Sequence, residues 1–341
     1  MSQQAAVIRA AHAQLVVEEH SIPTPRPGQL LVKIRAIGFS PLEAKIQKYA
    51  MIPLSYPNVL GTSYAGIVES VGEGVTKIKT GDKVAVVRTR FQMRSESGAF
   101  QQYALAAETS TSKLPETVSL EDAASTILNL AAIASAFSIV MGLDRPSLAE
   151  KAKPNGKKIF LYGGSSPAGG LGVSYAVAAG YTVVTTSSPA NKDFVQSLGP
   201  AVILDHTASD IADEIASHGP YDTIFDAIGF PVVTDLIAPY LSSVGGGIYY
   251  SFVPLTGSEK PLPGNVQRVS QPFSFAMDEE KNHESRDWFY DELLPKGLES
   301  GVIVPTRAQW LEGGLAKAQE ALDLMLAGKV TGRKLLLDPN A

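Results

Sequence analysis

The sequence predicts an α/β protein with two domains, one built on a doubly wound parallel sheet and the other rich in β-strands. Three observations predict this class. Short apolar segments bounded by glycine turns fill the first third of the chain, strands and helices alternate after about residue 120, and a glycine-rich turn joins one strand to a helix. With 341 residues the chain is long for one domain, and two domains of roughly 150 residues are the default expectation.

The N-terminal part predicts a small barrel or folded sheet. Its apolar segments are short and each adjoins a turn that contains glycine, a spacing typical of antiparallel strands. They are residues 30–36, 66–71 and 83–87.

The middle of the chain predicts a parallel sheet covered by helices on both faces. Residues 121–141 contain no Gly or Pro and predict a buried helix. The expected strands of the sheet are residues 158–162, 182–186, 201–204, 223–226 and 247–251. The last part of the chain predicts a helix over 314–327 and a strand over 334–337, and its residue pattern is again similar to that of the N-terminal part. We therefore expect a nucleotide-binding domain at 126–276, inserted into a discontinuous outer domain made of 1–125 and 277–341.

Composition argues against several classes of function. The net charge of −5 gives no general support for a nucleic-acid or anionic-membrane partner. We see no apolar run near the roughly 20 residues that span a bilayer, and the N-terminus does not resemble a signal peptide. The absence of cysteine excludes disulfides, thiolate zinc sites and a cysteine nucleophile. We expect a cytoplasmic protein with a small-molecule substrate and no metal.

The sharpest motif is the turn at residues 162–170, YGGSSPAGG, which follows a strand and opens a helix. Small residues let the backbone approach a pyrophosphate, and the helix N-terminus supplies amide donors and a positive dipole. An ordinary strand-to-helix turn is the alternative. The context favours cofactor binding, with contacts from Gly163, Gly164, Ser165, Ser166, Pro167, Ala168 and Gly169.

The end of the second strand of this domain predicts NADPH rather than NADH. NAD-binding folds usually carry an acidic residue there for the ribose diol, whereas this chain has TTSSPANK at 185–192. Ser187, Ser188 and Lys192 can donate to a 2′-phosphate. The same residues also fit a capped helix start, with Ser188 as N-cap and Pro189 after it. Both interpretations can hold together.

The chain resembles zinc-independent medium-chain dehydrogenases/reductases, including quinone oxidoreductases and the fungal trans-acting enoyl reductases that serve polyketide synthases. The resemblance runs nearly end to end. It is carried by PGQLLVKI at 27–34, LGTSYAGIVESVG at 60–72, GDKV at 81–84, GAFQQYA at 98–104 and GKVTGRK at 328–334. It implies a Rossmann dinucleotide-binding domain and a GroES-like barrel domain.

The resemblance also implies that catalysis uses no zinc. Zinc alcohol dehydrogenases of this superfamily have a cysteine ligand where this chain has Ser40, and a His-Glu pair at Thr62-Ser63. The zinc-free relatives often carry Asn in place of Ser40 and Asp in place of Ser63. A threonine near the nicotinamide corresponds to Ala131.

Further site residues are assigned only through the resemblance. Tyr49 lies within one position of a tyrosine that donates a proton in enoyl reductases, although it also fits an aromatic at a loop edge. Ser40 is the second candidate catalytic residue. Further cofactor contacts are expected from Ile228, Gly229, Phe252, Val253 and Lys334. The substrate pocket is expected to include Tyr64, Asn129, Phe273 and Phe275, although core packing explains the aromatic residues equally well.

Three functions remain open from the sequence. The first is NADPH-dependent reduction of an activated C=C bond in an enoyl thioester or enone, free or bound to an acyl carrier. The second is quinone reduction. The third is cofactor binding without turnover. The resemblance also implies a homodimer formed through edge strands near 247–251.

Overall fold

The structure is a computed structural model that describes residues 1–90, 93–149 and 152–341. It divides into two compact units. Unit 1 contains residues 1–131, 277–299 and 305–341, and unit 2 contains residues 132–276 and 300–304. The α/β class with one parallel sheet and one β-rich unit is confirmed. The first boundary falls a few residues after the expected position at 125, and the short segment 300–304 returns to unit 2.

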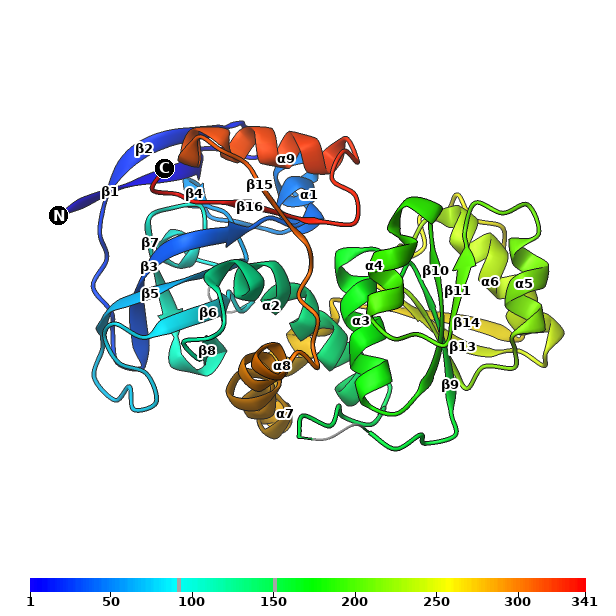
Figure 1. Cartoon of the computed structure of the whole chain (residues 1–341). Helices are drawn as coiled ribbons and strands as arrows, with labels where there is room; N and C mark the ends of the chain where they lie inside the picture. Colours follow the sequence, from blue (N-terminus) through cyan, green and yellow to red (C-terminus); the bar gives the residue numbers. More distant parts are fainter. Residues whose placement is uncertain (91–92, 150–151) are drawn as a thin grey trace. The chain divides into compact units, whose positions relative to one another are not determined.

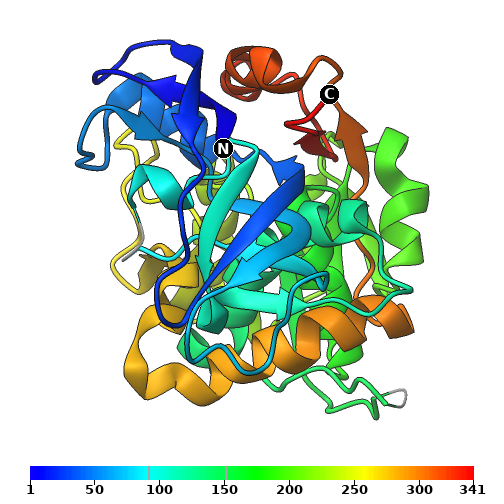
Figure 2. The ribbon, with the colours of Figure 1, turned by 90° about the vertical axis from the view of Figure 1, so that its left-hand side faces the viewer.

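Unit 1 is rich in β-strands (Figure 2), which pair antiparallel except for the parallel pair β15–β16. Within the described residues, its larger sheet has the order β15–β16–β3–β5–β6–β8, with β7 also paired to β3, and its smaller sheet has the order β2–β1–β4. The strands are β1 (Ser2–Ile8), β2 (Leu15–Ser21), β3 (Gln29–Gly38), β4 (Asn58–Val59), β5 (Ser63–Val71), β6 (Lys83–Val87), β7 (Tyr103–Ala107), β8 (Thr111–Lys113), β15 (Ala308–Trp310) and β16 (Lys334–Leu337). Both termini lie in this unit (Figure 2).

The core of unit 1 joins segments that are far apart in the sequence. Ile8, Val32 and Leu335 are fully buried in one apolar cluster. The helical elements of this unit are α1 (Pro41–Tyr49), η1 (Ser95–Ser97), η2 (Glu108–Ser110), α2 (Leu120–Ala134), η6 (Glu280–Asn282), α7 (His283–Trp288), η7 (Phe289–Leu293), α8 (Leu294–Ser300), η8 (Gly314–Lys317) and α9 (Ala318–Leu326), of which α2 and α8 run into unit 2.

Unit 2 is built on one sheet flanked by helices (Figure 1). In the described part of the chain its strands pair in parallel in the order β11–β10–β9–β12–β13–β14. Its strands are β9 (Lys158–Tyr162), β10 (Thr182–Ser187), β11 (Val202–Asp205), β12 (Thr223–Asp226), β13 (Gly247–Ser251) and β14 (Val266–Ser270). Its helical elements are η3 (Ser135–Val140), α3 (Pro167–Ala178), η4 (Pro189–Asn191), α4 (Lys192–Ser197), α5 (Ile211–Ser217), α6 (Pro231–Ser243) and η5 (Phe273–Asp278), the last of which ends in unit 1.

The strand order reverses between β9 and β12, because the chain first builds outward to β11 and then returns to build outward to β14. Ligands of open parallel sheets bind outside the carboxyl ends of the strands at such a reversal. The fold therefore directs the search for a cofactor site to the residues that follow Tyr162 and Asp226.

The expectation that residues 247–251 form an edge strand is wrong. Strand β13 pairs with β12 on one side and with β14 on the other, so β14 is the last strand of the sheet. The sequence analysis had not recognised residues 266–270 as a strand. Dimer formation itself stays a prediction.

One helical segment in the described part of the chain, Leu120–Val140, is long and apolar enough to cross a membrane. This corrects the expectation that no apolar run approaches that length. Within this segment, 67% of the most apolar stretch of 18 residues is buried inside the protein. A core helix of a soluble protein passes the same test of length and composition, so the segment is weak support for a membrane span.

Candidate functional site

The glycine-rich turn lies where β9 ends and α3 begins, at the reversal of strand order. Ser166 is the N-cap of α3, and its hydroxyl accepts a hydrogen bond from the N–H of Gly169 at 3.0 Å. Pro167 occupies the first helical position, where a missing N–H costs nothing. The sequence thus sets up a helix N-terminus at the carboxyl end of a parallel strand.

Two glycines of the turn cannot be replaced without moving the backbone. Gly163 has a φ of +93°, a conformation that side chains disfavour, and a Cβ there would lie 2.5 Å from Cγ1 of Ile228. A Cβ on Gly169 would lie 2.0 Å from the carbonyl oxygen of Gly163. The tight turn therefore depends on the absence of side chains at both positions.

Two backbone amides of the turn are free to bind an anion. Most of the N–H groups of the turn are used within the protein, including those of Gly163 and Gly164, which donate to the hydroxyl and carbonyl oxygens of Thr186 at 2.8 and 2.9 Å. The amides of Ser165 and Ala168 have no hydrogen-bond partner among the described residues. Two free donors at a helix N-terminus suit a pyrophosphate. The turn thus fits a dinucleotide, with fewer donors than the sequence analysis expected.

The end of β10 brings together the residues expected at the adenosine end of a cofactor. Ser187 is buried and its hydroxyl donates to the carbonyl oxygen of Ser188 at 3.0 Å, whereas Lys192 is exposed at the start of α4. Ser188 precedes η4 as its N-cap without a capping hydrogen bond from its side chain. Ser188 and Pro189 thus occupy the expected N-cap and first helical positions, but the expected side-chain cap is not formed. The Lys192 side chain is accessible to a ligand.

A carboxylate that the sequence analysis overlooked lies at the same edge. Asp205 ends β11 and is paired in register with Ser187 on the neighbouring strand. The N–H and hydroxyl of Thr207 lower the pKa of Asp205, and the charges of His206 and Lys192 lower it further. The sequence signal was present, because carboxyl ends of adjacent parallel strands meet at one edge. Asp205 therefore adds a negative charge beside Lys192.

The loop after β12 is held by a buried carboxylate. Asp226 is fully buried, and its Oδ1 accepts hydrogen bonds from the N–H groups of Ile228 and Gly229, both at 2.9 Å. Burial raises the pKa of Asp226, and these two backbone donors oppose the rise. The N–H groups of Ile228 and Gly229 are therefore occupied within the protein, so these residues can meet a cofactor only through other atoms.

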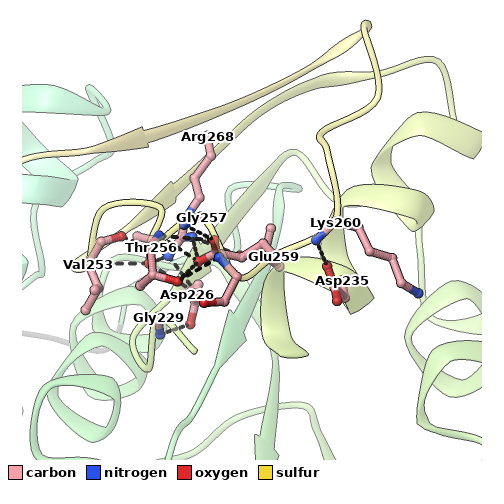
Figure 3. A network of polar contacts seen from close by, with 12 residues as sticks. Asp226, Gly229, Asp235, Val253, Thr256, Gly257, Glu259, Lys260 and Arg268 are labelled. Atoms are coloured by element: carbon pink, nitrogen blue, oxygen red, sulfur yellow. Dashed lines mark hydrogen bonds and ion pairs between the residues drawn. The ribbon is translucent and has the colours of Figure 1, made fainter. Parts of the chain in front are cut away.

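Arg268 on β14 joins this loop to the one after β13 (Figure 3). Its side chain is 1% exposed and donates to the Ser251 hydroxyl at 2.9 Å and to the Val253 carbonyl at 2.8 Å. It also lies 3.8 Å from Oδ2 of Asp226 and 3.7 Å from Oε1 of Glu259. One guanidinium thus connects both loops that follow the inner strands.

The acceptor Glu259 is itself held by its own loop. The N–H of Thr256 donates to the Glu259 carboxylate at 3.0 Å and lowers its pKa to about 2. The N–H of Gly257 donates to it at 2.8 Å. In Figure 3 the labelled Thr256, Gly257 and Glu259 surround the end of the Arg268 side chain. The sequence analysis missed this network, because ion pairs between strands leave no local motif.

Two of the aromatic residues expected near the site, Phe252 and Phe273, pack against Phe225 in unit 2. The ring centroid of Phe273 is 5.8 Å from that of Phe252 and 6.0 Å from that of Phe225, and Phe273 is 1% exposed. Phe275 is half-buried. For Phe273 the structure favours core packing, the alternative that the sequence analysis left open.

In unit 1, Ser40 and Thr62, two of the three residues that the resemblance aligns with zinc ligands, form a hydrogen-bond cluster around Glu43. The third, Ser63, donates to the carbonyl oxygen of Gly38 at 3.3 Å. Ser40 is the N-cap of α1 and forms a capping box with Glu43. The Glu43 carboxylate is fully buried and accepts hydrogen bonds from the N–H and hydroxyl groups of both Ser40 and Thr62. The Ser40 hydroxyl proton is therefore directed to Glu43.

Lys334 at the start of β16 is buried beside this cluster. It is 3% exposed, and burial lowers its pKa to about 8 against the opposing attraction of Glu43. A Cβ on Gly38 would lie 3.3 Å from Lys334 Cε and 3.1 Å from Ser63 Oγ, so these residues are close together. Lys334 and Ser40 are both predicted site residues, whereas their shared neighbour Glu43 carries no signal in the sequence that singles it out.

The remaining predicted residues of unit 1 lie in contrasting surroundings. Tyr49 ends α1 and is 63% exposed, whereas Tyr64 is fully buried in the apolar core. The Tyr64 hydroxyl has no hydrogen-bond partner in the described part of the chain. Asn129 lies half-buried on α2. Across residues 1–90, 93–149 and 152–341, no group of three or more His, Cys, Asp and Glu side chains could hold a metal ion.

Comparison with known proteins identifies a family domain in unit 1. Residues 26–116 match the alcohol dehydrogenase GroES-like domain. Among curated proteins, a trans-enoyl reductase of Aspergillus japonicus, himH, is 30% identical over 314 residues, covering 91% of this chain and 89% of that protein. The dehydrogenase azaJ of Aspergillus niger is 32% identical over 346 residues, covering 98% of each. The zinc-binding alcohol dehydrogenase domain-containing protein cipB of Emericella nidulans is 30% identical over 317 residues, covering 92% of this chain and 90% of that protein.

Solved structures share the whole fold. The Escherichia coli quinone oxidoreductase, solved in complex with NADPH, is 19% identical with a TM-score of 0.74, covering 99% of this chain and 100% of that one. At this identity the likeness concerns the fold alone.

Proposed function

Because the chain belongs to the medium-chain dehydrogenase/reductase superfamily, we propose that it is an NADPH-dependent, zinc-free oxidoreductase that reduces an activated C=C bond of an enoyl thioester or enone. Its relatives and its fold support an oxidoreductase of the enoyl reductase or quinone oxidoreductase type. The acceptor and the preference for NADPH are the proposal.

The observation that carries the proposal is the turn before α3. Its two free amides, Ser165 and Ala168, lie at a helix N-terminus and at the reversal of a parallel sheet. A bound reduced nicotinamide supplies the hydride, and the protein's task is to bind and orient. Reduction of an enone also requires stabilisation of an enolate oxygen and a proton at the α-carbon. Tyr49 remains the candidate donor of that proton, and its exposure leaves its hydroxyl accessible.

Replacing Lys192 with alanine is expected to weaken NADPH binding by about ten- to a hundredfold and to leave NADH binding nearly unchanged. A charge-assisted contact with the 2′-phosphate is worth roughly 1.5–3 kcal/mol, and about 1.4 kcal/mol is tenfold in affinity. Titration of the wild type and the variant with each nucleotide measures the effect. Lys157→Ala is the matched control, because exposed Lys157 lies just before β9, at the opposite end of that strand from the turn.

The neighbouring Asp205→Asn variant sharpens this test. The wild-type Asp205 carboxylate would repel a 2′-phosphate. Replacing it with a neutral amide is therefore expected to tighten NADPH binding and to leave NADH binding unchanged. An unchanged ratio of NADPH to NADH affinity in both variants would show that neither residue selects the cofactor.

Purified protein is expected to contain no stoichiometric zinc and to keep its activity after treatment with a chelator. The proposal is supported by Ser40, Thr62 and Ser63, whose hydroxyls take the places of thiolate, imidazole and carboxylate ligands. In addition, Glu43 is saturated by hydrogen bonds from Ser40 and Thr62. Elemental analysis that finds one tightly bound zinc per chain would contradict it.

Consumption of NADPH against a panel of crotonyl thioesters, enones and quinones tests the proposed reaction. We expect turnover of the thioesters and enones. The likeness to quinone oxidoreductases favours quinone reduction as the second candidate, and a strong preference for quinones would establish it instead. Binding of NADPH without turnover of any acceptor would support a cofactor-binding protein that has lost catalysis.

A further inference from the structure

Unit 1 contains a polar pocket of about 220 Å³ that the proposed reaction does not use. It lies where the end of β7 and the turn η2 meet α7 and η7. Its lining residues are Thr89, Ala107, Thr109, Ser110, Asp278, Arg286 and Tyr290. A drug-sized ligand needs a pocket of roughly 300–1,000 Å³, so this pocket is sized for one functional group or one segment of a longer ligand.

Contacts with neighbouring elements fix the residues that line the pocket. Arg286 and Tyr290 are four residues apart on successive helical turns, so their side chains leave the same face. The Ser112 hydroxyl donates to the carbonyl oxygen of Tyr290 at 2.6 Å and anchors that turn to β8. The N–H of Arg90 donates to Oδ2 of Asp278 at 3.1 Å. The charged and phenolic groups are thus held in place by contacts outside the pocket.

The donors of Arg286 are not satisfied by the described residues. The side chain is only 17% exposed, and its Nε is buried without a hydrogen-bond partner. The nearest carboxylates are Asp287 at 3.6 Å and Glu280 at 3.9 Å, distances too long for hydrogen bonds. A buried N–H without an acceptor is costly, so an acceptor from outside the protein that reached Nε of Arg286 would be favoured.

The charges of the pocket favour a neutral ligand. The pocket is lined by one acidic side chain, Asp278, and one basic side chain, Arg286. Glu280 and Asp287 add two more carboxylates near the guanidinium. An anion would therefore meet carboxylates as well as a guanidinium. Burial raises the pKa of the Tyr290 phenol, which keeps it protonated as a further donor. Burial also raises the pKa of Asp278, and the charges of Arg90 and Arg286 oppose the rise.

We propose that this pocket binds a neutral secondary amide, whose carbonyl oxygen accepts from Arg286 and whose N–H donates to Asp278. An amide carries a strong acceptor and a donor on opposite sides, which matches one guanidinium and one carboxylate that form no mutual ion pair within the described residues. The hydroxyls of Thr89 and Thr109 complete the polar lining.

Two sources supply this chemistry: a free small amide, or the pantetheine arm of a carrier-bound thioester. The second source rests on the proposed function, whereas the amide chemistry does not.

Saturation-transfer NMR with N-methylacetamide, in the absence of cofactor and substrate, tests the proposal separately from any turnover. We expect binding to the wild type and to the control Lys281→Met, whose side chain is 76% exposed. Binding is expected to fall by about tenfold or more in Arg286→Met and in Asp278→Asn, as the loss of a charge-assisted contact predicts. Asp278→Asn removes a charge without changing size, so it serves if Arg286→Met does not fold.

Comparison of N-methylacetamide with four further ligands decides the chemistry. Equal binding of N,N-dimethylacetamide, which lacks the N–H, would overturn the role of Asp278. Preference for acetate or for 1,2-propanediol, or binding of no probe, would overturn the assignment of an amide. Pantetheine that binds more tightly than N-methylacetamide, with the same dependence on Arg286, would identify the thioester arm as the source, and equal binding would identify a free amide.

Discussion

NADPH affinity is expected to fall by about a hundredfold or more when Gly169 is replaced by alanine. The new Cβ would lie 2.0 Å from the carbonyl oxygen of Gly163, so the backbone of the turn must move. That movement displaces the free amides of Ser165 and Ala168 from the pyrophosphate. The variant then loses two charge-assisted hydrogen bonds of roughly 1.5–3 kcal/mol each. About 1.4 kcal/mol corresponds to a tenfold change in affinity.

Gly170→Ala is the matched control for this experiment. A Cβ on Gly170 meets its nearest atom, the carbonyl oxygen of Gly164, at 3.3 Å, a contact that a small adjustment can relieve. Alanine also has the higher helix propensity at both positions, so propensity cannot explain a difference between the variants. Fluorescence titration with NADPH, with circular dichroism to check folding, measures the effect. Equal affinities in the two variants would exclude the turn as the pyrophosphate site.

Replacing Arg268 with methionine is expected to destabilise the protein by about 3–5 kcal/mol, the usual cost of breaking a buried ion pair by removing one partner. Arg268 is 1% exposed and Asp226 is fully buried, so the carboxylate would remain without its cation. The loops that follow β12 and β13 would also lose the hydrogen bonds to Ser251 and Val253. Urea unfolding measures the loss. Lys260→Met, an exposed position in the same loop region, is the control and should change stability by about 0.5 kcal/mol or less.

The loss of stability in Arg268→Met should shrink as the pH falls. Burial raises the pKa of Asp226, and the charge of Arg268 opposes that rise. Without Arg268 the folded pKa of Asp226 rises further above the unfolded value, so the folded variant binds the proton more readily than the unfolded chain. Stability of the variant should therefore increase from neutral pH toward pH values near the unfolded pKa of Asp. A difference from the wild type that is independent of pH would show that Asp226 does not depend on Arg268.

Cofactor selection illustrates how far a local pattern reaches. The lack of a carboxylate in 185–192, together with Lys192, is visible in the sequence and predicts that the adenosine end of a cofactor lies beside β10. Asp205 was equally visible but was assigned no role, because its relevance depends on its pairing in register with Ser187. A sequence motif identifies residues that are adjacent in the chain, but it does not identify residues on different strands that the sheet brings together.

The sequence by itself determined the class of the fold, the positions along the chain of most strands of the parallel sheet and the position of the glycine turn. These features follow from short-range physics: apolar periodicity, glycine at a positive φ in Gly163, and an N-cap at Ser166. Only the tertiary structure decided which amides of that turn remain free, since Thr186 on the next strand takes two of them. It likewise decided that Arg268 reaches Asp226 across 42 residues of sequence, and that Glu43 saturates Ser40 and Thr62. Burial and hydrogen-bond partners depend on which segments pack together, and no pattern within one segment contains that information.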